Sequence, residues 1–276
     1  MQIGISGDLS QEHISEIIRN ISKIGYSLVI DAHCHVDSDM YSDEERYNVI
    51  NRAIRYKVRM ITVPLSMNER KRALELKRKY QDWIDIVTGT HPLIDEDIES
   101  VIKFINEHQD LIVGIGEVGL DFKPPNNSFE SMEKQVKKFE KFIDLAKEID
   151  KPLVVHSRSA GRQSIDVLIR KNAERVLMHA FSGNVKYVRK GLEAGFYFSV
   201  PPTSYGNTQK INLIKTVPLD QMMLETDSPV LSPIKDVKNE PLNVLFSAYI
   251  VSKIKDIDII DVIKATTKNA KEFFRI

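Results

Sequence analysis

Two histidines stand one residue apart where an apolar run of the sequence ends. In the stretch VIDAHCHVDSD, residues 29–39, the run at 28–30 gives way to His33, Cys34 and His35. Side chains two residues apart on a strand face the same side, so His33 and His35 would point together. Cys34 would point away and serve as a small buried hydrophobe rather than as a ligand. Two imidazoles on one face can bind a metal ion; a hydrogen-bonded polar turn is the alternative.

Five further groups that could bind a metal or a phosphate follow later apolar runs. They are His91 in GTHP, Glu117 in GIGEVGLD, His156 in VVHSR, His179 in LMHAFSG and Asp227 in MLETDSP. Each of these residues has a structural alternative when taken alone. A histidine can be a hydrogen-bonded residue of the core, a glutamate can form a salt bridge at the rim of the fold, and an aspartate can cap the segment that follows it. Five of the seven histidines nevertheless lie at the ends of such runs, which favours one shared site.

The number of candidate ligands exceeds what one catalytic ion uses. A single tetrahedral catalytic ion usually takes three protein ligands, whereas the sequence offers six. They are His33, His35, Glu117, His156, His179 and Asp227. Six groups suit two ions bridged by a carboxylate, an arrangement that stabilises the attacking and leaving oxygens of a displacement at phosphorus. Nitrogen and oxygen ligands without thiolate fit two divalent ions among Zn, Mg, Mn, Ni and Co.

The elements that would position these groups alternate along the chain. Short runs rich in Val and Ile alternate with longer charged segments that have helical spacing. The runs lie at 28–30, 60–63, 84–88, 112–116, 153–155, 175–178, 196–200 and 222–224. The helical segments lie near 43–57, 67–80, 95–108, 130–149, 161–171, 184–194, 206–216 and 240–254. Eight such pairs predict a single-domain α/β fold, the (βα)8 TIM barrel, whose active sites lie at the carboxyl ends of the strands; a doubly wound open sheet is the alternative.

Residues 1–27 fall outside this alternation. They predict a short strand and a helix at 10–23, an N-terminal extension that we expect to pack on the barrel, where it could cover the floor. The barrel domain itself is expected to span 28–276.

Composition narrows the class of protein. Lys plus Arg equals Asp plus Glu, giving a formal net charge of +0, and this balance disfavours tight, sequence-independent binding to long nucleic acids. Neither a signal peptide nor a membrane-spanning run is recognisable in the sequence. The one cysteine excludes an internal disulfide framework. We expect a soluble, cytoplasmic protein without membrane contact.

Five motifs together carry a family resemblance. In order they are DAHCHVD, GEVGLDF, KPLVVHSR, HAFSGN and LETDSPVLSP. The chain from 28 to 276 resembles the TatD family of metal-dependent deoxyribonucleases, within the amidohydrolase-type barrels. Glu117 stands where other amidohydrolase-type enzymes carry a carbamylated lysine, which favours the TatD branch over the phosphotriesterase branch. The segment 200–210 and the N-terminal extension depart from the family pattern.

The resemblance implies a ligand assignment and a reaction. His33, His35, Glu117 and Asp227 would hold one ion, and Glu117, His156 and His179 the second. Water made acidic by the ions would lose its proton to Asp227 and attack phosphorus, so Asp227 and Glu117 are the expected catalytic residues. His91 and Arg158 would contact the substrate phosphate; a loop histidine and a rim ion pair are their structural alternatives.

Three functions remain possible at this point. The first is hydrolysis of DNA phosphodiester bonds, expected to proceed as a 3′–5′ exonuclease on a single strand or a 3′ end. The second keeps the metals but changes the bond, as in removal of an aminoacyl group from tRNA or cleavage of a lactone or small phosphoester. The third is a binding scaffold with structural metals, which the absence of thiolate ligands disfavours.

Overall fold

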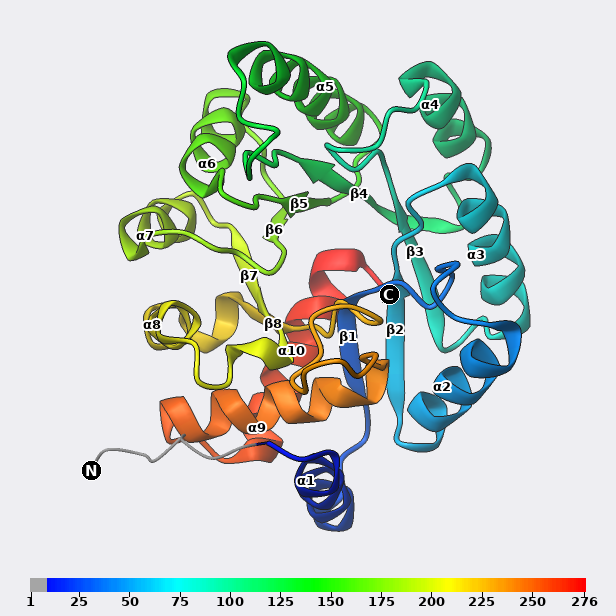
Figure 1. Ribbon diagram of the computed structural model, residues 1–276, viewed down its shortest axis with the longest axis vertical. Coiled ribbons are helices and arrows are strands. Elements are labelled where there is room, and N and C mark those ends of the chain that lie inside the picture. Colours follow the sequence, from blue (N-terminus) through cyan, green and yellow to red (C-terminus); the bar gives the residue numbers. More distant parts are fainter. Residues whose placement is uncertain (1–8) are drawn as a thin grey trace.

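The eight strands form one parallel sheet that curves into a barrel. The structure is a computed structural model that describes residues 9–276. The strands follow one another around the barrel in sequence order, each parallel to the next (Figure 1). They are β1 Val29–Cys34, β2 Val58–Thr62, β3 Ile84–Thr88, β4 Ile112–Gly119, β5 Leu153–His156, β6 Val176–Met178, β7 Tyr197–Val200 and β8 Met222–Leu224. The predicted (βα)8 barrel is confirmed.

Helices surround the strands on the outside. Within residues 9–276 they are α1 Gln11–Ile24, α2 Asp43–Arg55, α3 Met67–Lys79, α4 Ile98–Glu107, α5 Phe129–Glu148, α6 Gly161–Arg170, α7 Val185–Glu193, α8 Thr208–Thr216, α9 Val244–Lys255 and α10 Ile259–Phe274. Short 3₁₀ turns occupy Pro202–Ser204, Leu219–Gln221 and Pro241–Asn243. The sequence prediction lacked α10 and ended β1 and β4 too early: the structure includes His33 in β1 and Glu117 in β4.

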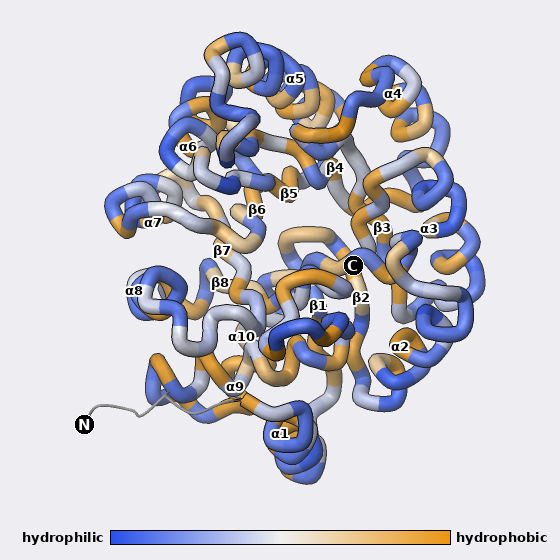
Figure 2. The backbone as a smooth tube through the Cα atoms, in the orientation of Figure 1, coloured by the Kyte–Doolittle hydropathy of each residue, from blue (hydrophilic) through white to orange (hydrophobic). Residues whose placement is uncertain are grey.

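Local sequence explains where several helices begin. α2 starts after Ser42, whose side chain accepts from the backbone N–H of Glu45, while the Glu45 carboxylate accepts from the N–H of Ser42. This reciprocal capping box satisfies two donors that a helix end leaves free. The surrounding helices alternate between hydrophilic and hydrophobic residues along their length, as expected for helices with one buried face (Figure 2). None of the helices in the described part of the chain is both long and apolar enough to cross a bilayer.

The inside of the barrel is a packed apolar cluster closed at its floor by α10. Ile30, Ile61, Val87 and Leu177 are among the strand residues of this cluster, and Phe273 from the end of α10 joins them. The Asn269 side chain of α10 donates to the Met222 and Leu219 carbonyls beside the start of β8. The polar chemistry is therefore confined to the opposite end, where the strands terminate.

The described part of the N-terminal extension packs on the outside of the helix layer. Ser10 caps α1, and Ile14, Ile18 and Ile21 of this helix are buried in the apolar cluster between strands and helices. Figure 1 shows α1 beside α9, away from the barrel axis. The expectation that this helix could cover the floor is wrong because α10 occupies that place; the strand expected near the N-terminus falls at 1–8, outside the described residues.

Candidate active site

An irregularity near the end of β1 turns His33, and His35 just after the strand, toward the barrel mouth. Asp31 pairs with Met60 of β2, and Cys34 pairs with Thr62, so β1 takes three steps where β2 takes two. Such a bulge shifts the inside-outside alternation of a strand. The Nε2 atoms of His33 and His35 consequently lie 3.3 Å apart. Cys34 packs in the outer apolar cluster, facing away from them.

A second irregularity, in β4, presents Glu117. Ile115 pairs with Leu153 of β5 and Val118 with Val155, again three steps against two. Gly116 lies within this stretch, and a Cβ on it would come within 2.6 Å of the Val154 carbonyl oxygen. Glycine is therefore needed to seat the strand that carries the carboxylate.

His33, His35 and Asp227 form one donor group. The Oδ1 atom of Asp227 lies 3.0 Å from His35 Nε2 and 3.5 Å from His33 Nε2. The Asp227 backbone N–H donates to the His33 carbonyl at 2.8 Å, and the His35 N–H donates to the Ser228 carbonyl at 2.7 Å. These bonds join β1 to the segment after β8. Asp227 has a φ of 57°, in the left-handed region that non-glycine residues adopt uncommonly.

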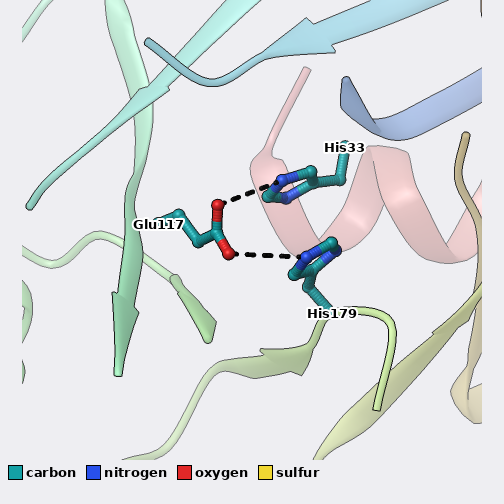
Figure 3. A group of neighbouring side chains, drawn as sticks. All are labelled: His33, Glu117 and His179. Carbon is teal, nitrogen blue, oxygen red and sulfur yellow. Dashed lines mark ion pairs between the residues drawn. The ribbon is translucent and has the colours of Figure 1, made fainter. Parts of the chain in front are cut away.

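Glu117 links this group to a second one. Its Oε2 lies 3.6 Å from His33 Nε2, and its Oε1 lies 3.5 Å from His179 Nε2 and 2.5 Å from His156 Nδ1. Figure 3 shows the Glu117 carboxylate beside the His33 and His179 rings, with one oxygen directed at each ring. These two rings stack with centroids 3.7 Å apart. The six predicted ligands are thus brought together, with the two oxygens of Glu117 facing different partners.

Buried acceptors orient two of the imidazoles. His35 Nδ1 lies 2.5 Å from the Val63 carbonyl oxygen. His179 Nδ1 lies 2.8 Å from Glu225 Oε2, and Glu225 also accepts from the Ala180 N–H at 2.8 Å. With these nitrogens occupied, Nε2 of each ring is the atom that faces the site.

Asp121 orients the imidazole ring of His156. Its Oδ2 lies 3.0 Å from His156 Nε2 and accepts from Arg158 Nε at 2.7 Å. Sequence reasoning missed both Asp121 and Glu225, although they stand within GEVGLDF and LETDSP. A charged residue beside a buried strand end is the signal that could have identified them.

The carboxylate of Glu117 depends on the surrounding imidazoles. Burial raises the pKa of Glu117, but the neighbouring His156, His91 and His179 outweigh it and hold this pKa well below its usual range. Burial opposes charge on His156 too, yet Glu117 raises the pKa of that histidine above its usual value.

In the group formed by His33, His35 and Asp227, charged neighbours also shift the pKa values. Burial disfavours a charged His35, but Asp227 raises the pKa of His35 to about 10. Burial raises the pKa of Asp227, and the neighbouring His179 and His35 lower it to a greater extent. His33 differs, because burial and the nearby His179 lower its pKa.

These donors fit a divalent metal centre. The buried carboxylates require positive charge nearby, and a divalent cation would supply it while the imidazoles stay neutral and able to bind. Mixed nitrogen and oxygen donors without a thiolate are a usual ligand set for such ions. Within residues 9–276, three sets of side chains each bring three potential ligand atoms within 4.8 Å of one another: His33–His35–Asp227, His33–Glu117–His179 and His91–Asp121–His156.

The two predicted substrate contacts lie beside the candidate metal ligands. Nδ1 of His91 accepts from the Leu93 N–H at 3.2 Å, and its Nε2 lies 3.9 Å from Glu117 Oε1. Burial lowers the pKa of His91 to about 4, so the ring is neutral and carries its proton on Nε2. Arg158 is half-exposed and uses Nε to bind Asp121, which leaves its terminal amino groups for a ligand.

Five of the six candidate metal ligands and both predicted substrate contacts line one cavity at the barrel mouth, whereas His33 does not contribute to its lining. The cavity has a volume of about 620 Å³. Its lining includes His35, His91, Glu117, His156, Arg158, His179 and Asp227, together with Leu65, Thr203, Asn207, Lys210, Val230 and Leu231. A space of this size suits a ligand of nucleotide dimensions.

Comparison with known proteins shows which class of protein has this sequence and site. The family model for TatD related DNase matches residues 30–275. Deoxyribonuclease TATDN3 of Homo sapiens is 35% identical over 259 residues, covering 89% of this chain and 94% of the human protein. A Bacillus subtilis protein described as an uncharacterized metal-dependent hydrolase is 33% identical over 261 residues, covering 90% of this chain and 100% of the relative.

A solved structure shows the same fold. The crystal structure of YJJV, a TatD homolog from Escherichia coli K12, matches with a TM-score of 0.82 at 24% identity, covering 90% of this chain and 98% of that chain. The barrel, its buried donors and these relatives define a metal-dependent hydrolase. The chain belongs to the TatD family, as its five motifs predicted.

Proposed function

We propose that this protein is a deoxyribonuclease that uses two divalent metal ions to hydrolyse phosphodiester bonds of DNA. The observation that carries the proposal is the placement of Glu117, whose two oxygens face different histidines at the base of one cavity. A carboxylate whose two oxygens face different partners can be shared by two neighbouring ions, as in two-metal hydrolytic sites. Relatives named as deoxyribonucleases support DNA as the substrate.

The ligand atoms divide between the two ions. His33, His35, Asp227 and Oε2 of Glu117 would hold one ion, while Oε1 of Glu117, His156 and His179 would hold the other. When bound, such ions acidify water and neutralise charge on a phosphoryl group. Mg, Mn, Zn, Ni and Co are all compatible with these donors.

The protein side chains orient the reaction. The pKa of Asp227 lies below its usual value, chiefly because His179 and His35 outweigh the effect of its burial. Asp227 is therefore ionised and able to orient the attacking water and accept its proton. His91 can donate from Nε2 to a phosphate oxygen, and the terminal amino groups of Arg158 can hold a second oxygen in a charge-assisted bond.

The cavity favours a strand end over the middle of a duplex. The ligands are buried at the base of a space of about 620 Å³, which is of the size that small-molecule ligands fill. We therefore propose that this site acts on the end of a single DNA strand, and we keep the 3′–5′ direction expected from the sequence.

A substrate and metal panel tests the function. Metal-stripped protein is supplied with Mg, Mn, Zn, Ni or Co and given single-stranded DNA with a free 3′ end, the same strand with phosphorothioate 3′ linkages, matching RNA, and an aminoacyl ester. We expect stepwise release of mononucleotides from the free 3′ end and strong inhibition by the phosphorothioates. Hydrolysis of the ester without cleavage of DNA under every metal would contradict the proposal.

Replacing Asp227 tests its role in the chemistry. Asp227→Asn preserves shape but cannot accept the proton, so turnover at saturating metal should fall by about 10²- to 10⁴-fold, the usual contribution of such a base. Turnover is measured together with circular dichroism and metal titration, and Asp220→Asn, at an exposed position, serves as the matched control. Wild-type turnover in Asp227→Asn would remove this residue from the reaction.

A further inference from the structure

Lys210 is a buried cation in the wall of the catalytic cavity. It lies in the first turn of α8, and its side chain lines the cavity. Its Nζ donates to the Ala180 carbonyl at 2.5 Å and to the Phe181 carbonyl at 2.8 Å. Only 9% of the residue is exposed. Lys210 belongs to the segment 200–210 that departs from the family pattern in sequence.

The charge of Lys210 lacks the partner that other buried cations have. Arg46 pairs with Asp43 at 2.5 Å, and Arg70 pairs with Glu96. Among residues 9–276 no carboxylate oxygen lies within 4.0 Å of Lys210 Nζ, whose acceptors are neutral carbonyls. A buried charge without a direct ion pair is unfavourable, and burial lowers the pKa of Lys210 to about 8, although the Glu225 and Asp227 carboxylates act in the opposite direction. Such a cation is suited to an anion that enters from the cavity.

Neighbouring side chains extend this polar wall. Thr203 and Asn207 line the cavity together with Lys210. Asn207 Oδ1 accepts from the Lys210 backbone N–H at 3.1 Å, so its amide Nδ2 is the group it can offer to a ligand. A hydroxyl, an amide and an ammonium group from one segment provide the donors that a phosphate requires.

We propose that Lys210, assisted by Asn207 and Thr203, binds the phosphate next to the scissile linkage of a DNA strand. This inference rests on the proposed function. The scissile phosphate must lie among the metal ligands, and the Nζ hydrogen bonds of Lys210 go to the Ala180 and Phe181 carbonyls rather than to any of them. Because Lys210 makes no direct contact with those ligands, we assign to it the phosphate next to the scissile one. Ion pairing there strengthens ground-state and transition-state binding alike, so it should act on KM more than on kcat.

Substrates with a neutral neighbouring linkage test the contact. Lys210→Met, Lys210→Arg and wild-type enzyme are compared on a short single-stranded oligonucleotide and on versions carrying one methylphosphonate, placed either at the first or at the second linkage on the 5′ side of the scissile, 3′-terminal linkage. Lys215→Met, at an exposed position on the same helix, is the matched control. We expect Lys210→Met to raise KM about tenfold, the effect of losing one charge-assisted bond, with Lys210→Arg recovering most of it.

The decisive comparison is between loss of the Lys210 charge in the enzyme and loss of the phosphate charge in the substrate. In the wild-type enzyme one methylphosphonate position should raise KM by about the same factor as Lys210→Met, and in Lys210→Met that position should add nothing further. An equal penalty in both enzymes would overturn the proposal. So would a uniform fall of kcat on every substrate with weaker metal binding, which is the signature of a residue that only fixes the Ala180–Phe181 turn.

A binding measurement separates this inference from the proposed function. If the wild-type enzyme cleaves no DNA under any metal, the proposed function fails, whereas calorimetric titration of metal-loaded protein with the dinucleotide pTpT still reports on Lys210. About tenfold weaker binding by Lys210→Met than by Lys215→Met supports the subsite. Equal binding by the two variants refutes it.

Discussion

Glu225 shows how much of the site depends on residues that touch no substrate. The residue is fully buried and accepts hydrogen bonds from His179 Nδ1, the Ala180 N–H and the Ser199 hydroxyl. These contacts fix the ring of His179 and the left-handed backbone of Ala180, whose φ is 40°. A ligand held in this way loses little conformational entropy when it binds a metal.

Replacing this acceptor should weaken metal binding without abolishing the fold. Glu225→Gln keeps the shape but exchanges one acceptor oxygen for a donor, which faces other donors. We expect metal affinity to fall by about 10- to 100-fold, as for other residues that orient a ligand, measured by calorimetric titration. Ser199→Ala removes one donor and leaves the carboxylate, so its effect should be much smaller. Wild-type affinity in Glu225→Gln would contradict this role.

At the residue scale, the candidate ligands that the structure brings together were recognisable in the sequence, whereas the residues that orient them were not. His33, His156 and His179 were recognisable because a polar residue that interrupts an apolar run is conspicuous in sequence. Lys210 and Glu225 stand among ordinary polar residues. Their importance comes from burial, which depends on contacts between segments far apart in the chain.

At the scale of elements, irregular strands position the donors. Regular alternation would have placed His33 on the same side as Asp31, and the bulge in β1 instead directs it to the mouth with His35. The bulge in β4 likewise presents Glu117. Strand alternation can be recognised in a sequence, whereas the position of a bulge depends on the pairing register. The sequence therefore predicted that these residues face the site but did not predict the bulges that place them there.

Replacing Gly116 tests whether the bulge in β4 positions Glu117. In Gly116→Ala the new Cβ would meet the Val154 carbonyl oxygen at 2.6 Å, so the strand must shift. We expect the free energy of unfolding in urea to fall by about 1–3 kcal/mol and metal affinity to fall with it. Gly206→Ala, at a φ of +68° with nothing within 4 Å of the added carbon, should lose stability only. Equal metal affinity in the two variants would show that Glu117 tolerates the shift.

At the scale of the whole molecule, the barrel separates stability from chemistry. The alternation of strands and helices predicted the barrel, and the polar run ends predicted which face carries the site. The sequence prediction did not include α10, because a helix added after eight strand-helix pairs extends no repeat. Its function in the fold is to close the floor, where Thr267 donates to the Leu28 carbonyl ahead of β1.

Phe273 tests this separation. It is 3% exposed, belongs to the cluster inside the barrel and meets the Tyr197 ring edge-on at 5.4 Å. Phe273→Ala should lower the free energy of unfolding by about 3–5 kcal/mol, the usual cost of such a cavity. Phe129→Ala, at a residue 81% exposed, should change it by less than about 0.5 kcal/mol.

Turnover distinguishes a floor that only stabilises from one that shapes the site. Because α10 caps the amino ends of the strands and the ligands lie at their carboxyl ends, Phe273→Ala should retain wild-type kcat and metal affinity at temperatures where it stays folded. Both are measured below the onset of unfolding, with the folded fraction taken from the urea curve. A fall in kcat without loss of folded protein would mean that packing at the floor reaches the donors through the barrel interior, and the two ends could not then vary independently.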